Sequence, residues 1–297
     1  MTYLSVKEAA LQWKISPRSV RNYCAAGRVP GAVLKGKTWC IPVSSPKPSR
    51  QKKSTPPSAN GLAARLLAEM NAKLHGGIYH KLQIELTYNS NHMEGSRLTH
   101  DQTRFIYETN TLGMGDGIVN VDDVVETANH FRCIDLVIRQ MAEPVTQGLI
   151  KQLHALLKNG TSDSRLDWFA VGDYKKVPNE VGGRETTPPE RVEQEMELLL
   201  IDYENGQAKS FEDIVAFHYR FEAIHPFQDG NGRVGRLLLL KECLRHNHVP
   251  FVINEELKPF YYRGLTAWRQ EKGYLIDTCL TAQDQFKKWM DYFRIAY

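Results

Sequence analysis

Residues 225–236 read HPFQDGNGRVGR, and this stretch decides how the rest of the chain is interpreted. An apolar helical pattern that starts at Ser210, with Asp213 as its capping partner, precedes it. A second apolar run at 237–244 follows it. The stretch is therefore expected to be a loop that leads into the N-terminus of a helix, where unpaired N–H groups and the helix dipole attract anions.

The residue types in this loop suit a phosphate group. Gly230 and Gly232 flank Asn231, and these residues can turn their backbone N–H groups inward as an anion nest. Arg233 and Arg236 lie about one helical turn apart and supply bidentate donors. Because a glycine-rich turn alone is weak evidence, the prediction of a phosphate site depends on its combination with the two arginines.

The same loop holds residues that suit catalysis. Asp229 is a hard oxygen ligand for Mg²⁺ beside phosphates, and His225 has the pKa range of a general base. Together they would help to hold a triphosphate and deprotonate an attacking hydroxyl. Nearby residues have simpler interpretations: we expect His218 to be structural and Phe227 to anchor the loop in the core.

The loop resembles the signature of the Fic family, H-x-F-x-D-G-N-G-R-x-x-R, at every specified position, and the resemblance extends over about residues 61–297. It implies a mainly α fold, a Fic-type helical bundle with a β-hairpin flap. It also implies transfer of AMP from ATP to a Ser, Thr or Tyr hydroxyl of a target protein, with Mg²⁺. The resemblance implies that His225 is the base and Asp229 the metal ligand. The implied nucleotide-binding residues of the loop are Asp229, Gly230, Asn231, Gly232, Arg233, Gly235 and Arg236. Gly232 and Arg233 argue against the kinase-like relatives, which have Asn-Lys there.

A second motif, SNHMEG at 90–95, ends a helix expected to start near Ile78. The helix dipole disfavours an acid at a helix C-terminus, so Glu94 needs a reason. The segment is similar to the family's inhibitory motif, S/T-x-x-x-E-G/N, so that 78–95 would be an inhibitory helix. In that interpretation Glu94 pairs with Arg236 and removes the donor that would hold the γ-phosphate. The alternative is an exposed glutamate at a helix end.

The interval 172–189 is rich in Gly and Pro and suits a hairpin. It resembles the family's flap, which pairs with the target's backbone by strand addition. The resemblance places further residues against the nucleotide: Val181, Gly182, Gly183, Arg184, Tyr261 and Tyr262. The tyrosine pair suits a core position equally well, and Arg269 stands where the family often has Asn, which leaves the contacts to the base open.

Apolar residues also recur at helical spacing elsewhere in the large segment. The helices expected from this pattern are 62–75, 78–93, 119–141, 146–157, 189–204, 211–224 and 233–246.

The N-terminal part differs in charge from the rest. Residues 1–53 contain eleven Lys or Arg and one acid, whereas the remainder has 27 basic and 33 acidic residues. Residues 44–60 are mostly Pro, Ser and Lys and read as a linker, so we expect a module at 1–43 and a domain at 61–297.

The basic module has two helix starts, a capping box at Ser5 and a Ser16-Pro17 pair, followed by two short strands within 33–41. It resembles a MerR/excisionase-type winged helix-turn-helix. The implied DNA contacts are Arg18, Arg21, Asn22, Lys35 and Lys37. A basic module that docks a protein is the alternative.

Composition narrows the class of protein. The chain has 297 residues, 42% of them hydrophobic, and no apolar run approaches the roughly 18 residues of a membrane helix. Its five scattered cysteines are expected to be free thiols, which favours a cytoplasmic protein without membrane contact. Candidate partners are a target protein, DNA and a second copy of the chain, as a homodimer.

Two other functions compete with AMP transfer. One is the reverse reaction, in which Glu94 orients a water that removes AMP from a modified protein. The other is a DNA-bound regulator whose Fic-like domain only senses nucleotide.

Overall fold

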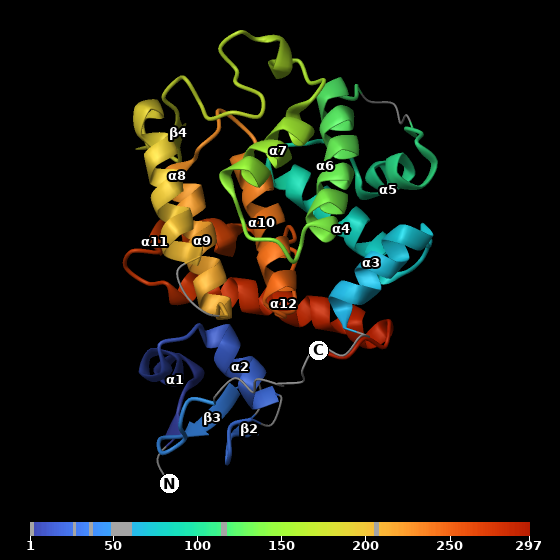
Figure 1. The fold of residues 1–297 in the computed structure, drawn as a ribbon. Coiled ribbons are helices and arrows are strands. Elements are labelled where there is room, and N and C mark those ends of the chain that lie inside the picture. The colour runs from blue at the N-terminus through green and yellow to red at the C-terminus, as the bar shows by residue number, and fades with distance from the viewer. Residues whose placement is uncertain (1–2, 26–27, 36–37, 49–60, 114–117, 205–207) are drawn as a thin grey trace. The chain divides into compact units, whose positions relative to one another are not determined.

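The computed structural model describes residues 3–25, 28–35, 38–48, 61–113, 118–204 and 208–297, and these are mainly helical (Figure 1). The chain divides into two compact units. Unit 1 comprises Met1–Pro56 with Pro259–Thr281, and unit 2 comprises Pro57–Lys258 with Ala282–Tyr297. Residues 49–60, most of the expected linker, lie outside the described residues.

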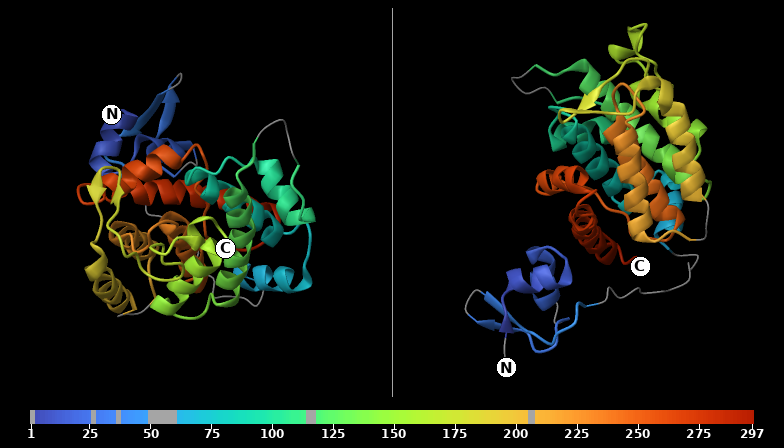
Figure 2. Two further views of the ribbon diagram at one scale, coloured as in Figure 1. Left: turned by 90° about the horizontal axis from the view of Figure 1, so that it is seen from above. Right: turned by 90° about the vertical axis from the view of Figure 1, so that its left-hand side faces the viewer.

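Unit 2 is a helical bundle built around α10. Its helices are α3 (Leu62–Ala72), α4 (Ile78–Met93), α5 (His100–Thr109), α6 (Val121–Arg139), α7 (Gln147–Lys158), α8 (Pro189–Glu204), α9 (Phe211–Ile224), α10 (Asn231–Arg245) and the end of α12 (Gly273–Tyr292). The central helix, α10, lies beside α9 and also packs against α4, α6 and α7 (Figures 1 and 2). Thirteen of its residues are buried, as expected of a helix surrounded by protein.

The helices expected from apolar periodicity are confirmed, with ends displaced by a few residues. The expectation omitted α5, which starts at a capping box of Thr99 and Gln102, and also α11 (Lys258–Ala267) and α12. The signal for α5 was present in the sequence, because Thr followed three residues later by Gln is a helix-start pattern.

The expected hairpin is present in the interval 172–189. Strands β4 (Glu180–Val181) and β5 (Arg184–Glu185) pair antiparallel, with Val181 opposite Arg184. Gly182 and Gly183, which form the turn, have φ of 58° and 74°. Two successive positive φ angles are what a tight hairpin turn of the primed type requires.

Unit 1 contains a small sheet and two N-terminal helices. The elements are β1 (Tyr3–Leu4), α1 (Val6–Trp13), α2 (Pro17–Ala25), β2 (Val33–Lys35) and β3 (Thr38–Pro42), and the strand order is β1-β3-β2. The capping box of Ser5 and Glu8 opens α1, as expected. The core of this part consists of apolar side chains from α1, α2 and β3, among them Trp13, Val20 and Ile41. Strand β1 was not expected.

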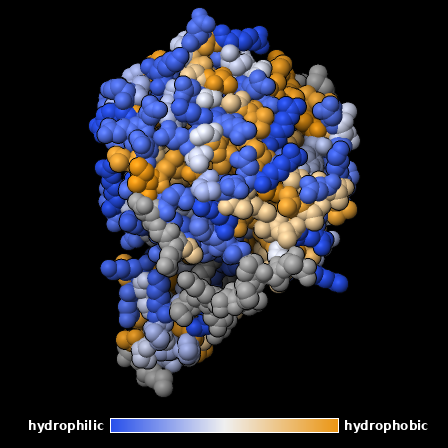
Figure 3. Space-filling model, in the orientation of Figure 1, coloured by the Kyte–Doolittle hydropathy of each residue, from blue (hydrophilic) through white to orange (hydrophobic). Residues whose placement is uncertain are grey.

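Surface and helix composition bear on membrane contact. Within the described residues, no helix combines the length and apolar character needed to cross a bilayer. On the face that Figure 3 shows, hydrophobic residues are interspersed among hydrophilic ones over unit 2.

All five cysteines are free, as expected. The cytoplasmic location stays a prediction.

Candidate functional site

The stretch 225–236 is the loop and helix start that its sequence predicts. His225, the residue after α9, adopts a left-handed conformation with φ of 54°, and Gly230 caps α10 with φ of 81°. The side chain of Asn231 closes the loop: its Oδ1 accepts from the backbone N of Phe227 and its Nδ2 donates to the backbone O of Phe227, both at 2.8 Å. Since that side chain is occupied, an anion would meet Asn231 through its backbone N–H.

Phe227 anchors the loop in the core, as expected. It is fully buried and stacks on the ring of His154 in α7, with ring centroids 4.0 Å apart. His154 Nδ1 in turn accepts the backbone N–H of Gly172 at 2.9 Å. The loop that starts at His225, α7 and the start of the hairpin segment are therefore packed against one another.

The surroundings of His225 favour its neutral form. Burial, together with the charge of Lys175, lowers its pKa to about 4. The imidazole is therefore neutral near pH 7, which is the form a general base needs. His218 differs: it is buried in α9 and burial lowers its pKa to about 3, which fits the structural role expected for it.

Asp229 is ionised and held by two cations. Its Oδ2 lies 2.8 Å from Lys158 Nζ and 3.0 Å from Arg233 Nη2. Burial alone would raise the pKa of Asp229, but the charges of Arg233 and Lys158 outweigh it and hold that pKa below its usual range. Arg233, only 4% exposed, also pairs with Glu126 of α6.

The residues at this position fit Mg²⁺ bound together with a nucleotide. The Asp229 side chain is 45% exposed, so its carboxylate remains within reach of solvent. No group of three or more His, Cys, Asp or Glu among the described residues could hold a metal ion. Magnesium is commonly held by one or two carboxylates, substrate phosphates and water, so Asp229 with a triphosphate would suffice.

The predicted contact between Glu94 and Arg236 is present. Glu94, at the C-terminal cap of α4, has its Oε1 2.6 Å from Arg236 Nη2. Arg236 also donates to Ser90, from Nε to Oγ at 2.9 Å and from Nη2 to the backbone O at 3.0 Å. A Cβ at Gly232 would stand 2.3 Å from Glu94 Oε1, so the carboxylate lies directly against the loop. The inhibitory role of this contact stays a prediction.

Gly235 faces the interior. A Cβ there would stand 2.4 Å from Glu222 Oε1 and about 3 Å from the ring of His218, both on α9. Close packing of α9 on α10 explains the glycine, and the contact of Gly235 with nucleotide stays a prediction. Burial raises the pKa of Glu222 to about 8, with a smaller contribution from the charge of Glu94, and this carboxyl is protonated near pH 7.

Hydrogen bonds join the hairpin segment to the loop that follows His225. Lys175 donates its backbone N–H to the carbonyl of Pro226 at 2.9 Å, and Asn179 Nδ2 donates to the carbonyl of Phe227 at 3.1 Å. Lys175 Nζ donates a hydrogen bond to Asn179 Oδ1 at 2.7 Å, and burial lowers the pKa of Lys175 to about 8. At the tip, residues 181–184 are exposed. Their predicted contact with nucleotide stays a prediction.

The remaining predicted residues belong to unit 1. Tyr261 is buried and Tyr262 is 40% exposed, both on α11, and their contact with the base stays a prediction. The predicted DNA contacts Arg18, Arg21, Asn22 and Lys35 are all exposed, the first three on α2 and the last on β2. Lys37 lies outside the described residues.

Several residues of the site escaped the sequence analysis. They are Glu126, His154, Lys158, Asp163, Asn179 and Glu222. One signal was available: His154 and Lys158 are four residues apart, next to the apolar positions Leu153 and Leu157 of α7. Polar residues that share a helix face with a core stripe indicate a buried polar cluster.

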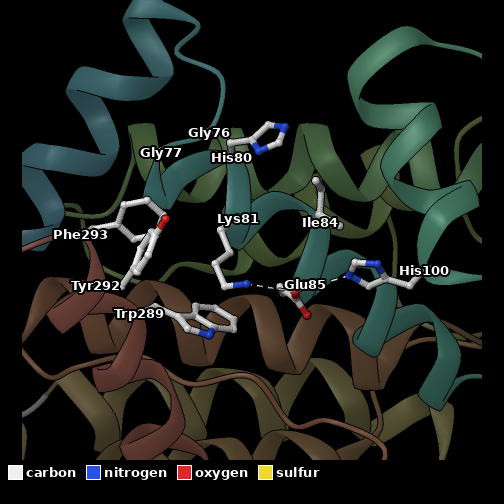
Figure 4. Close-up of a pocket in the computed structure, with 10 residues that line it drawn as sticks. All are labelled: Gly76, Gly77, His80, Lys81, Ile84, Glu85, His100, Trp289, Tyr292 and Phe293. Carbon is white, nitrogen blue, oxygen red and sulfur yellow. Dashed lines mark hydrogen bonds and ion pairs between the residues drawn. The ribbon is translucent and has the colours of Figure 1, made fainter.

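A pocket in unit 2 lies away from this loop. It has a volume of about 550 Å³ and is lined by residues of α4 and the C-terminal end of α12, with Gly76, Gly77 and His100 (Figure 4). Lys81 and His100 both approach Glu85 there, and Lys81 lies over the ring of Trp289. The pocket includes none of the predicted nucleotide-binding residues, so the candidate site rests on the charge and geometry of the loop rather than on the size of a hollow.

Comparison with known proteins agrees with the loop. Residues 144–243 match the model of the Fic/DOC family. The chain is 26% identical over 181 residues to "Protein adenylyltransferase Fic" of Nematostella vectensis, covering 60% of this chain and 41% of that protein. It is also 26% identical over 184 residues to "Protein adenylyltransferase fic-1" of Caenorhabditis elegans, covering 60% and 35%. The chain thus spans about two fifths or less of the length of these curated relatives.

Solved structures share the fold. A Fic domain containing signalling protein from Bacteroides thetaiotaomicron aligns with a TM-score of 0.58 at 26% identity, covering 77% of this chain and 90% of that one. Fic-1 of C. elegans aligns with a TM-score of 0.60 at 20% identity, covering 77% and 69%. The expected mainly α, Fic-type fold is confirmed.

Proposed function

We propose, from the Fic domain matched at residues 144–243, that this protein transfers AMP from ATP to a Ser, Thr or Tyr hydroxyl of a target protein. The observation that supports this most strongly is the arrangement of the loop 225–236. A neutral histidine, an ionised aspartate with access to solvent and the N-terminus of a buried helix stand within twelve residues. The names of the curated relatives, protein adenylyltransferases, point to the same reaction.

The reaction would run as an in-line displacement at the α-phosphorus. The target oxygen forms a bond to this phosphorus, the bond to the bridging oxygen breaks, and pyrophosphate leaves. The neutral imidazole of His225 takes the hydroxyl proton. Arg233 and the N–H groups at the start of α10 bind the phosphates and stabilise the charge that develops. Asp229 would hold Mg²⁺, which supplies Lewis-acid stabilisation of the phosphate oxygens when bound.

Glu94 would keep the resting protein inactive. Its ion pair with Arg236 occupies the donor intended for the γ-phosphate, and its carboxylate lies against Gly232. An incoming triphosphate would meet a negative charge, so its α-phosphate would be misaligned for attack.

The position of Glu94 also supports a second candidate reaction, the removal of AMP from a modified protein. A carboxylate held against the loop could orient a water toward a phosphodiester bound there. Under that function, Glu94→Gly would abolish the removal of AMP.

Residues 1–43 would bind DNA. One helix exposes the side chains of Arg18, Arg21 and Asn22, and this part of the chain has a strongly positive net charge. Both features support contacts with the phosphates and bases of DNA. The rival in which the Fic domain only senses nucleotide for a DNA-bound regulator predicts a specific DNA site but no AMP-labelled protein.

Incubation of a host lysate with radioactive ATP tests the proposal. With ATP labelled at the α-phosphate, we expect a lysate protein to become radioactive when the Glu94→Gly variant is added. No protein should be labelled without added enzyme. Labelling from the γ-phosphate instead would indicate a kinase and contradict AMP transfer.

A further inference from the structure

A buried lysine stands behind the catalytic loop. Lys158, the last residue of α7, has only 2% of its side chain exposed. Its Nζ lies 2.6 Å from Glu126, 2.9 Å from Asp163 and 2.8 Å from Asp229. Burial of a charge is unfavourable unless partners compensate it, and here three carboxylates converge on one ammonium.

The cluster joins four separate parts of the fold. Glu126 comes from α6, Lys158 from α7, Asp163 from the 3₁₀ turn Asp163–Arg165, and Asp229 from the catalytic loop. Glu126 also pairs with Arg233, the phosphate-binding arginine of the proposed site. With two cations and three carboxylates, the cluster has a formal net charge of −1.

Lys158 and Asp229 differ in how firmly the protein encloses them. The Asp229 side chain is 45% exposed, whereas Lys158 is enclosed and has the ring of Phe169 5.3 Å from its Nζ. A half-exposed aspartate has several accessible rotamers, and an enclosed cation that binds one of its oxygens selects among them.

We propose that Lys158 is a positioning residue of the AMP-transfer site. Its ammonium holds Oδ2 of Asp229 and neutralises part of the charge of Glu126, Asp163 and Asp229, so that Asp229 and Arg233 keep the places in which they meet the nucleotide and Mg²⁺. The role in transfer rests on the proposed function, whereas the hold on Asp229 does not.

Removal of the ammonium has two effects of opposite sign. In Lys158→Met, which keeps the length of the side chain, Asp229 loses the partner that orients it. Measured in the Glu94→Gly background, AMP transfer should then fall roughly ten- to a hundredfold, the usual effect of losing an outer partner of a ligand. The carboxylates, freed of an internal cation, should attract a divalent ion more strongly. The affinity of the nucleotide-free protein for Mn²⁺ should therefore rise by at least about tenfold.

Mn²⁺ titration followed by the EPR signal of the free ion measures binding without nucleotide and without turnover. Lys241→Met is the matched control. Lys241 is also fully buried and pairs with a carboxylate, Glu242, but its other contact is the backbone carbonyl of Glu143. Whatever its effect on the melting temperature, Lys241→Met should leave both the Mn²⁺ affinity and the rate of AMP transfer unchanged.

A second variant covers the case in which Lys158→Met does not fold. In Lys158→Met combined with Asp163→Asn, the formal charge of the cluster returns to −1. The gain in Mn²⁺ affinity should shrink. AMP transfer should remain low, because Asp229 still lacks the ammonium that orients it.

Higher Mn²⁺ affinity together with slower transfer supports the proposal. Unchanged Mn²⁺ affinity, or unchanged transfer, overturns it. A fall in both, with a greater loss of melting temperature than in Lys241→Met, shows a merely structural lysine and also overturns it. If neither the parent protein nor Glu94→Gly transfers any AMP, the proposed function fails, and a raised Mn²⁺ affinity still supports the hold of Lys158 on Asp229.

Discussion

The substitution Glu94→Gly should activate AMP transfer. In the structure, Glu94 Oε1 lies 2.6 Å from Arg236 Nη2, and the carboxylate stands against Gly232 at the start of α10. The change removes a negative charge from the phosphate site and frees a donor for the γ-phosphate. Because Glu94 is a helix cap followed by a glycine with φ of 96°, a further glycine there perturbs the fold little.

The size of the effect follows from the charges. Two unit charges about 4 Å apart interact by about 4 kcal/mol at an effective dielectric constant of about 20. The Glu94 side chain is 25% exposed, so solvent screening applies. The repulsion of a phosphate is then roughly 1–3 kcal/mol. Since about 1.4 kcal/mol corresponds to a tenfold change in rate, transfer should rise roughly ten- to a hundredfold.

The assay measures radioactive AMP incorporation by the parent, Glu94→Gly, Arg236→Ala and a control, Glu85→Gln. Glu85 lies on the same helix, is 24% exposed and is ion-paired, but with Lys81 and His100. The control should behave as the parent. Arg236→Ala should gain nothing, because it loses the partner of Glu94 and the phosphate donor together. Equal labelling by the parent and Glu94→Gly would refute autoinhibition while leaving the catalytic loop assignment untouched.

Three further predictions concern protonation and DNA. In an NMR titration of the nucleotide-free protein, His225 should stay neutral down to about pH 5, because burial and the charge of Lys175 lower its pKa to about 4; a midpoint near the ordinary value of about 6.5 would contradict this. Glu222→Gln should gain stability relative to the parent as pH rises from 4.5 to about 8, because folded Glu222 retains its proton there while the unfolded chain releases it. The free energy of unfolding of the parent should drop by up to about 1.4 kcal/mol per pH unit relative to the variant. If the stabilities of the two proteins change equally with pH, the pKa of Glu222 is not raised. Finally, the full-length protein should bind duplex DNA with an affinity that falls as salt rises, and replacing Arg18 and Arg21 by Ala should reduce the salt slope by about 2; an absence of binding at low salt would exclude DNA as the partner.

Local pattern was sufficient for much of the fold. Helix α4 was predicted with its ends at Ile78 and Met93, because an apolar stripe and a terminal Gly95 mark both its face and its stop. The loop before α10 was predicted from twelve consecutive residues, since glycines, a cap position and arginines are all local signals. The contact of Glu94 with Arg236 joins residues 142 positions apart, and resemblance to a known motif, rather than periodicity, predicted it.

Long-range ion pairs were not predictable in this way. Lys158 meets Glu126, Asp163 and Asp229 only because α6, α7 and the loop converge, and no spacing in the sequence encodes that meeting. The packing of Gly235 against Glu222 and His218 of the adjacent helix was likewise not predictable from its place inside a phosphate motif. The same limitation applies to residues 259–281, whose grouping with the N-terminal segment depends on contacts far apart in sequence.

The most direct test of the central claim is AMP transfer by Glu94→Gly compared with the double variant Glu94→Gly/His225→Ala. Both proteins should bind ATP with similar affinity, because His225 is a base rather than a phosphate ligand in this account. With ATP labelled at the α-phosphate, Glu94→Gly should modify protein and the double variant should show no incorporation. Incorporation at similar rates by both would contradict the account, because a reaction that proceeds without His225 does not use the loop as proposed.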